Sequence, residues 1–129
     1  MTVAVLDASA ILALLQTEPG HERVRAVLAD AAASTVNLGE VVGYLARHGA
    51  AAEAVRRVLD PLPFERVPFG EELAYGAGLL LPVTRSAGLS LGDRACLALA
   101  RQLGVKCLTA DRSWLSIAEA TGVEIELIR

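Results

Sequence analysis

Four acidic residues, spread along the chain, each stand where a short apolar run gives way to a helix-like pattern. They are Asp7, Glu40, Asp93 and Asp111. If they met in the fold, their carboxylates would repel one another, and a divalent cation would relieve that repulsion. Mg²⁺ and Mn²⁺ prefer oxygen ligands, and no histidine or cysteine belongs to the set, which argues against zinc. A cation held by carboxylates typically serves phosphoryl or phosphodiester chemistry, so we expect Mg²⁺ or Mn²⁺ as the cofactor.

Each of these acids also has a structural explanation as a helix cap. Asp7 and Asp111 precede helix-like segments, where a carboxylate accepts hydrogen bonds from free N–H groups of the first turn. Two segments resemble capping boxes, with a polar residue three positions before the acid: Asn37 before Glu40, and Ser90 before Asp93. Capping explains each acid alone, but it does not explain why four acids would share one place in the fold.

The elements that would position these acids alternate between strands and helices. Apolar, β-prone runs predict strands at residues 2–6, 34–36, 64–67, 105–109 and 123–128. Helical spacing predicts helices at residues 9–15, 21–31, 38–48, 50–59, 71–81, 90–102 and 112–120. This alternation predicts an α/β fold, a three-layer α/β/α sandwich around a mainly parallel sheet. The order of its four to five strands stays open.

Chain direction brings the four acids to the same edge of that sheet. Asp7 and Asp111 directly follow strands, and Glu40 opens the helix after the second strand. The helix of Asp93 runs into the strand at 105–109 with only Gly104 between them. Because a parallel strand begins at the edge formed by the amino ends of the strands, that helix ends at this edge and begins at the opposite one, formed by the carboxyl ends. Ligands bind at the carboxyl ends of the strands in open α/β sheets, which makes all four acids candidate catalytic and metal-binding residues.

Length, charge and cysteine content narrow the class of protein. The chain has 129 residues and no linker-like stretch, so we expect one domain over residues 1–129. Its net charge of −3 argues against a nucleic-acid partner, but without the four acids 12 basic residues stand against 11 acidic ones. Cys96 and Cys107 lie in apolar segments and are expected to be reduced core thiols of a cytoplasmic protein. No run is long enough to span a membrane, and no secretory signal is expected.

Three segments carry the four acids in order: VLDASAILALL, VNLGEVVGYLAR and LSLGDRACLALARQLGVKCLTADRSW. Together they resemble the PIN-domain family, specifically the VapC-type toxins of bacterial toxin–antitoxin pairs, over essentially the whole chain. The resemblance implies a PIN-like fold and an endoribonuclease that uses Mg²⁺ or Mn²⁺ and leaves a 5′-phosphate and a 3′-hydroxyl. The four acids of the family correspond to Asp7, Glu40, Asp93 and Asp111.

The resemblance also implies roles for individual side chains. Asp7, Glu40 and Asp93 would hold the metal directly or through water. Asp111 would complete the site, or position a second ion or the attacking water. Thr109 corresponds to the small hydroxyl residue usual before the last acid.

Other polar residues near the acids allow two interpretations each, a functional one and a purely structural one. Ser9 is either a phosphate or supporting contact, or only a polar residue of the first helical turn. Arg112, like Arg85 and Arg94, is either an RNA phosphate contact or solvated surface charge. Asn37 departs from the Ser or Thr common in relatives, and all three residue types can cap a helix.

The implied partners are an RNA substrate, a cognate VapB-type antitoxin and a second copy of the chain. The antitoxin would lie in a groove between the early helices, and a homodimer would form a heterotetramer or larger complex with it. The expected effect is inhibition of translation. The main alternative is a non-catalytic PIN-like module that binds RNA or protein, although such modules typically lose site acids. Dehalogenase-type phosphatases fit poorly because Ser9 stands where they need a second Asp.

Overall fold

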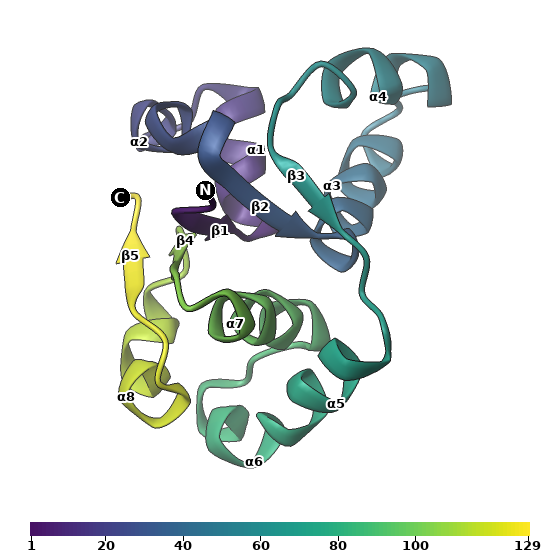
Figure 1. Ribbon diagram of the computed structural model, residues 1–129. Coiled ribbons are helices and arrows are strands. Elements are labelled where there is room, and N and C mark those ends of the chain that lie inside the picture. Colours follow the sequence, from purple (N-terminus) through teal and green to yellow (C-terminus); the bar gives the residue numbers. More distant parts are fainter.

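Five parallel strands form the central sheet. In the computed structural model, which describes residues 1–129, the strands are β1 (Ala4–Leu6), β2 (Ala31–Ser34), β3 (Glu65–Val67), β4 (Lys106–Thr109) and β5 (Ile125–Leu127). Their order is β3-β2-β1-β4-β5, and every neighbouring pair is parallel (Figure 1). The chain thus extends the sheet from β1 in one direction and, after β3, in the other. The strand order reverses between β1 and β4, which is where open α/β sheets form their ligand crevice.

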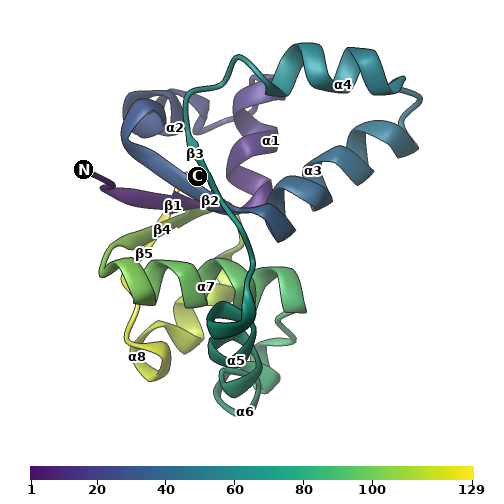
Figure 2. The same cartoon turned by 45° about the vertical axis from the view of Figure 1, so that its right-hand side comes forward.

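Helices cover both faces of this sheet (Figure 2). One layer contains α1 (Ala8–Gln16), α2 (His21–Val27), α3 (Thr35–Arg47) and α4 (Ala52–Leu59). The other contains α5 (Glu71–Leu79), α6 (Leu81–Thr84), α7 (Leu91–Leu103) and α8 (Ala118–Thr121). This arrangement confirms the expected three-layer α/β fold with a parallel sheet. None of the helices combines the length and apolar character needed to cross a membrane.

Each face of the sheet has its own apolar core, because alternate strand residues point to opposite faces. On β1, Leu6 belongs to the core beneath α1 to α4, and Val5 belongs to the core on the α7 side. The second core also contains Trp114, which is fully buried. Its cysteines, Cys96 and Cys107, are free thiols with their Sγ atoms 3.5 Å apart. This agrees with the expected pair of reduced core thiols.

The second strand lies earlier than the sequence predicted. We expected a strand at 34–36 and a helix from residue 38, but β2 is Ala31–Ser34 and α3 begins at Thr35. Ser34 caps the helix, its hydroxyl accepting a hydrogen bond from the Val36 N–H at 3.1 Å. Asn37 is therefore inside the helix, and its assignment as the cap was wrong. The small side chains of Ala31 to Ala33 fit between the two helical layers, which overrides their low strand propensity.

Three predicted helices are divided in the structure. The segment 21–31 becomes α2 followed by the 3-10 helix η1 (Leu28–Asp30). The segment 71–81 ends at Leu79, and Pro82 lies in the first turn of α6, where proline's missing N–H costs no hydrogen bond. The segment 112–120 becomes the 3-10 helix η3 (Arg112–Ile117) followed by α8. The helix predicted at 90–102 is present as α7, with Ser90 as its cap.

Candidate active site

Asp7 lies at the carboxyl end of β1, beside the point where the strand order reverses. Its side chain caps α1, accepting a hydrogen bond from the Ala10 N–H at 2.8 Å. The residue is only 4% exposed, so its charge is largely removed from water. Burial raises the pKa of Asp7 from 3.8 to about 6, although its hydrogen bonds act in the opposite direction. The nearby charge of Asp93 adds to the increase.

Two hydroxyl groups hold the Asp7 carboxylate, one at each oxygen. The Ser9 hydroxyl donates to Oδ1 at 2.7 Å, and the Thr109 hydroxyl donates to Oδ2 at 2.5 Å. Each hydroxyl oxygen also accepts a backbone N–H from the loop after β4, Ser9 from Ala110 at 2.9 Å and Thr109 from Asp111 at 3.0 Å. Because each accepts an N–H from one side, its own proton is directed toward Asp7. Ser9 and Thr109 therefore fix both the orientation of Asp7 and the course of the loop that carries Asp111.

Asp93 stands in the first turn of α7, the helix in the centre of its layer. It forms a capping box with Ser90: the Ser90 N–H donates to Oδ2 at 3.0 Å, and the Asp93 N–H donates to the Ser90 hydroxyl at 3.2 Å. The second carboxylate oxygen has no donor within the protein. The predicted capping box is confirmed, and one carboxylate oxygen of the half-buried Asp93 stays free for a ligand.

Glu40 reaches the same place from α3. The residue is exposed overall, but its carboxylate lies against the backbone of Gly92, where an added Cβ would come within 2.3 Å of Glu40 Oε2. Its Oε1 accepts a hydrogen bond from Asn37 Nδ2 at 2.8 Å. Desolvation raises the pKa of Glu40, and the charge of Asp93 raises it further, while the Asn37 hydrogen bond lowers it. Glu40 therefore packs beside Asp93, the neighbour of Gly92, and the charge of Asp93 raises the pKa values of both Glu40 and Asp7.

Asp111 lies at the same edge of the sheet, in the loop that follows β4. Its Oδ1 accepts hydrogen bonds from the Ser113 N–H at 2.9 Å and the Ser113 hydroxyl at 2.7 Å, which cap η3. The residue is exposed, and its backbone N–H links it to Asp7 only through Thr109. Like Asp93, Asp111 uses one carboxylate oxygen in its cap, and its other oxygen has no donor within the protein.

The donor set fits a hard divalent cation, although the acids do not form a complete cage. No group of three or more acidic, histidine or cysteine side chains has the convergence needed to hold a metal ion by itself. Two observations are consistent with a cation at this place. The negative charge of Asp93 raises the pKa values of both Asp7 and Glu40, and one carboxylate oxygen of Asp93 has no donor within the protein. All the available donors are oxygen atoms, as Mg²⁺ and Mn²⁺ require.

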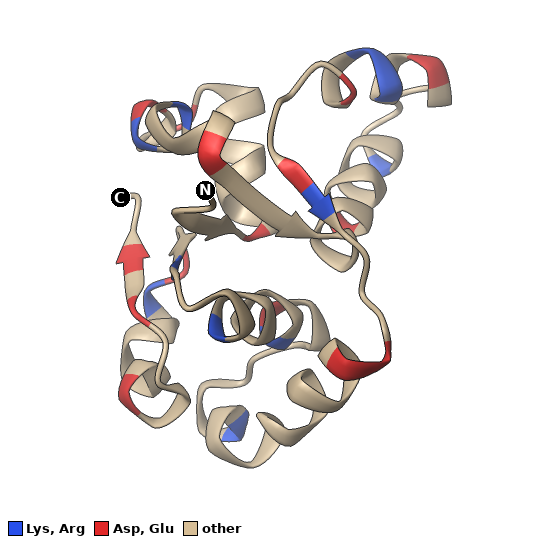
Figure 3. Cartoon of the chain, in the orientation of Figure 1, with Lys and Arg blue, Asp and Glu red and all other residues tan.

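The basic residues do not gather into one strongly positive face. In the view of Figure 3, the Lys and Arg segments are scattered among the acidic ones. Arg112 is exposed and donates to the Arg129 carbonyl oxygen at 3.3 Å, near the site edge. Arg94 is tied down, since it donates to the Ala77 carbonyl oxygen of α5 at 2.9 Å. Arg112 is therefore the freer of these two for an anionic ligand.

Two functional candidates, Asn37 and Gly92, were missed in the sequence. Asn37 was taken for a cap, yet it is buried and contacts both Glu40 and α7. Its position three residues before Glu40, on the same helical face, was the available signal. The role of Gly92 depends on a contact with α3 that no local pattern indicates.

Comparisons with known proteins agree on the fold. The sequence model described as PIN domain matches residues 4–120. Among solved structures, the chain is similar to DNA-bound VapBC from Salmonella typhimurium, with 20% identity, 100% of both chains covered and a TM-score of 0.77. It is also similar to a toxin–antitoxin complex from Klebsiella pneumoniae, with 16% identity, 98% of both chains covered and a TM-score of 0.74.

A third similar structure is VapBC-5, a member of the VapBC family of toxin–antitoxin systems, from Mycobacterium tuberculosis. Its identity is 20%, the match covers 100% of this chain and 99% of the other, and the TM-score is 0.63. No curated protein matches the chain by sequence. At identities this low, the structural likeness establishes the fold, and the residues of the site carry the argument about function.

Proposed function

The chain belongs to the PIN domain family, and from that premise we propose that it is a divalent-metal-dependent endoribonuclease. The observation that supports the proposal is that Asp7 follows β1 where the strand order reverses, while the Glu40 carboxylate packs against Gly92, the neighbour of Asp93. Helix capping accounts for Asp7 and Asp93 individually, but not for Glu40, whose carboxylate serves no cap. A cation-binding site accounts for all three.

Asp7, Glu40 and Asp93 would hold Mg²⁺ or Mn²⁺, directly or through water, with Asp111 as the fourth candidate. When bound, such a cation lowers the pKa of a water molecule and offsets the negative charge that develops on a phosphate. Ser9 and Thr109 keep both oxygens of Asp7 in one orientation. Arg112 is available to bind an RNA phosphate outside the acidic site. These roles together suit hydrolysis of a phosphodiester bond in RNA.

The test is cleavage of total RNA by the purified protein with Mn²⁺ or Mg²⁺, with and without excess EDTA. We expect cleavage that stops in EDTA and that falls roughly 100-fold or more in Asp7→Asn, because a ligand carboxylate is lost. Asp30→Asn, which changes an exposed acid outside the site in the same way, should keep wild-type activity. Undiminished cleavage in excess EDTA would sink the nuclease proposal. Complete absence of cleavage would favour the alternative of a non-catalytic PIN-like binding module.

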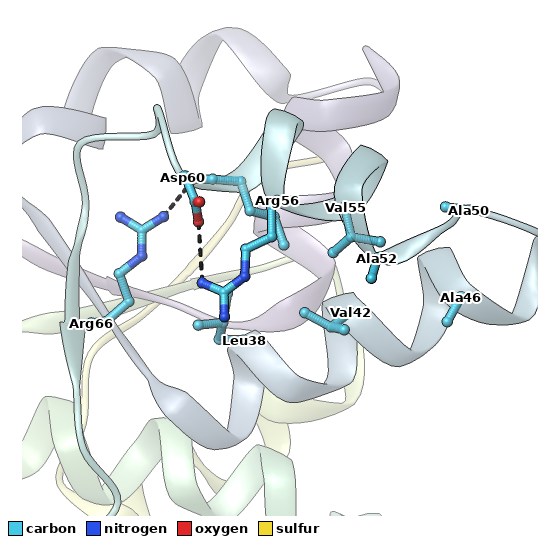
Figure 4. Close-up of a pocket in the computed structure, with 10 residues that line it drawn as sticks. Leu38, Val42, Ala46, Ala50, Ala52, Val55, Arg56, Asp60 and Arg66 are labelled. Carbon is cyan, nitrogen blue, oxygen red and sulfur yellow. Dashed lines mark hydrogen bonds and ion pairs between the residues drawn. The ribbon is translucent and has the colours of Figure 1, made fainter.

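The similar toxin–antitoxin structures lead us to propose that the chain is the toxin of such a pair, with a VapB-type antitoxin as its partner. A groove of about 530 Å³ between α3 and α4 suits a bound peptide segment. Leu38, Val42, Val55 and Leu59 give it an apolar lining, while Arg56, Asp60 and Arg66 stand at one end (Figure 4). An amphipathic antitoxin segment would match this combination.

The groove can be tested separately from the nuclease. The first step is to look for a small open reading frame immediately upstream of the gene. If expression of the chain arrests growth, co-expression of the protein encoded there should restore it. Val42→Asp puts a charge on the groove lining, so it should abolish that rescue while cleavage by the purified protein stays unchanged. Val58→Asp is the matched control, since Val58 is also exposed on the neighbouring helix but does not line the groove. Rescue that survives Val42→Asp would contradict the groove as the antitoxin-binding place, and expression that leaves growth unaffected would contradict the toxin proposal.

We also propose that the chain is a homodimer that forms a heterotetramer or larger complex with its antitoxin. Tyr75 and Leu79 are 65% and 77% exposed and lie side by side on α5, so together they form an apolar surface that a second copy could cover. Light scattering of the purified protein should give twice the chain mass. A monomeric mass at micromolar concentration would contradict this arrangement.

A further inference from the structure

Asn37 is a buried polar residue placed between α3 and α7, the two helices that carry Glu40 and Asp93. It lies on α3, is 1% exposed, and uses both protons of its amide nitrogen. Nδ2 donates to Glu40 Oε1 at 2.8 Å and to the Gly92 carbonyl oxygen at 3.0 Å. Both partners can only accept, so the orientation of the amide is fixed by its surroundings. One side chain therefore connects Glu40, α3 and the first turn of α7.

Burying Asn37 at this position costs free energy, because its amide is not fully hydrogen-bonded. Its Oδ1 is buried and accepts no hydrogen bond within the chain, so part of the amide is desolvated without compensation. An apolar residue of similar size would avoid that penalty and still fill the space. The stability of the helix contact alone does not explain an asparagine here.

Glu40 has few other constraints. Its helix buries only Asn37 and Val41, and Asn37 is the only hydrogen-bond donor to its carboxylate. A glutamate side chain has several rotatable bonds, and holding it in one geometry costs conformational entropy. On the opposite side, Gly92 leaves the space the carboxylate occupies, because a Cβ there would come within 2.3 to 2.6 Å of its atoms.

We propose that Asn37 is a positioning residue that holds the Glu40 carboxylate against the first turn of α7, beside Asp93, in the space left by Gly92. The inference rests on the proposed metal-dependent function and adds to it a residue outside the four acids. Asn37 acts through Glu40 and has no contact with the substrate in this role. Residues that orient metal ligands in this way typically contribute about 10- to 100-fold to metal affinity or activity.

The first experiment measures Mn²⁺ affinity by calorimetry, and kcat and KM for RNA, in Asn37→Ala. We expect Mn²⁺ affinity and kcat to fall by about 10- to 100-fold, with KM for RNA little changed. Asn37→Asp, which keeps the shape but replaces the donor with an acceptor facing Glu40, should lose at least as much. Gln102→Glu, the same change of an amide to a carboxylate on the exposed end of α7, is the control for added charge. Affinity and kcat within twofold of wild type in Asn37→Ala would overturn the proposal.

A double mutant separates positioning from general structural support. In a Glu40→Gln background, Asn37→Ala should change Mn²⁺ affinity by less than about twofold, because the residue acts through the lost carboxylate. Fully additive losses would show that Asn37 acts elsewhere, and would overturn the proposal. The comparison also holds if Asn37→Ala lowers the unfolding temperature, provided binding is measured well below it.

Gly92→Ala is a second, independent way to displace the Glu40 carboxylate, because the added Cβ would occupy its place. The atoms it meets belong to the far end of the Glu40 side chain, so the fold should persist while Mn²⁺ affinity falls. Gly39→Ala, one residue before Glu40 and with nothing within 4 Å of its new Cβ, should leave affinity unchanged. If the wild type neither binds Mn²⁺ nor cleaves RNA, the proposed function fails and this inference with it. If the wild type does both and the variants at Asn37 and Gly92 match it, only this inference fails.

Discussion

The two sides of the acidic site are built in different ways. On the inner side, Asp7 follows a central strand and accepts three hydrogen bonds, from Ala10, Ser9 and Thr109. On the outer side, Glu40 stands on α3 and has one donor, Asn37. The first carboxylate takes its geometry from the sheet, whereas the second depends on a single neighbouring side chain. A carboxylate on a helix at the rim of the fold needs its own support.

The two helices that carry Asp93 and Glu40 show the same contrast. Both have 13 residues. In α7, seven residues are buried, including the continuous run from Ala95 to Ala100, whereas α3 buries only Asn37 and Val41. Figure 1 shows α7 inside its layer and α3 extending with α4 to one side of the sheet. We therefore expect the inner side of the site to be energetically tied to the whole fold, and the outer side to be adjustable.

The largest expected effect tests this contrast with the same substitution on each helix. Leu99→Ala on α7 removes a fully buried side chain and should lower the free energy of unfolding by about 2 to 5 kcal/mol. Leu45→Ala on α3 removes a partly buried one and should cost about 1 kcal/mol. Urea unfolding monitored by circular dichroism gives both values. Equal costs would remove the distinction between the two helices.

The second prediction concerns the energetic cost of the inner carboxylate. Because the folded-state pKa of Asp7 is raised to about 6, its protonated form favours folding. That contribution is present at pH below about 4 and is lost as pH rises through 6. A shift of about two pKa units corresponds to about 3 kcal/mol of unfolding free energy in metal-free protein.

Asp7→Asn should remove this pH dependence. In EDTA, the free energy of unfolding of the variant should rise relative to that of the wild type by up to about 3 kcal/mol between pH 4 and pH 7, measured by urea unfolding at each pH. Taking the difference between the two proteins removes the pH dependence that other groups contribute equally to both. One such group is Glu126, whose pKa is lowered to about 2 by the hydrogen bond from Arg23, so its contribution to stability changes with pH in the opposite direction. Parallel profiles for the two proteins would mean that Asp7 carries no burial penalty.

The smallest expected effect is a gain in stability from a substitution on α3, on the outer side of the site. Gly43 lies in the interior of α3, exposed, with nothing within 4 Å of the Cβ that a substitution would add. Gly43→Ala should therefore raise the free energy of unfolding by about 0.5 to 1 kcal/mol through helix propensity alone. Thermal unfolding measures this, with Gly39→Ala as a second example on the same helix. A loss of stability would indicate that this face of α3 is packed after all.

The sequence predicted the fold class and the common edge of the acids, because both follow from the alternation of elements and from chain direction. The capping roles were also predicted correctly, Asp7 as the N-cap of its helix and Asp93 as the acid of a capping box. Metal binding by the four acids stays a prediction. Strand order could not be derived, since runs as short and uniform as AVL and AAAS carry no pairing information.

The supporting residues escaped prediction for a different reason. Asn37 and Gly92 are 55 positions apart, and their contact exists only after α3 packs against α7. A single sequence shows local periodicity, caps and turns, but not which side chains meet across two helices. The misplaced cap at Asn37 had the same origin, because Ala31 to Ala33 look unlike a strand until both helical layers enclose them.

The buried thiols of Cys96 and Cys107 can report local unfolding of the core around them. Burial raises the pKa of Cys96 well above its usual range, so alkylating reagents react only with molecules in which α7 has separated from β4. The rate of thiol labelling under native conditions therefore reports how often the core beneath Asp7 and Asp93 opens. A cation held by Asp7 and Asp93 would slow that labelling, so metal binding can be followed without RNA.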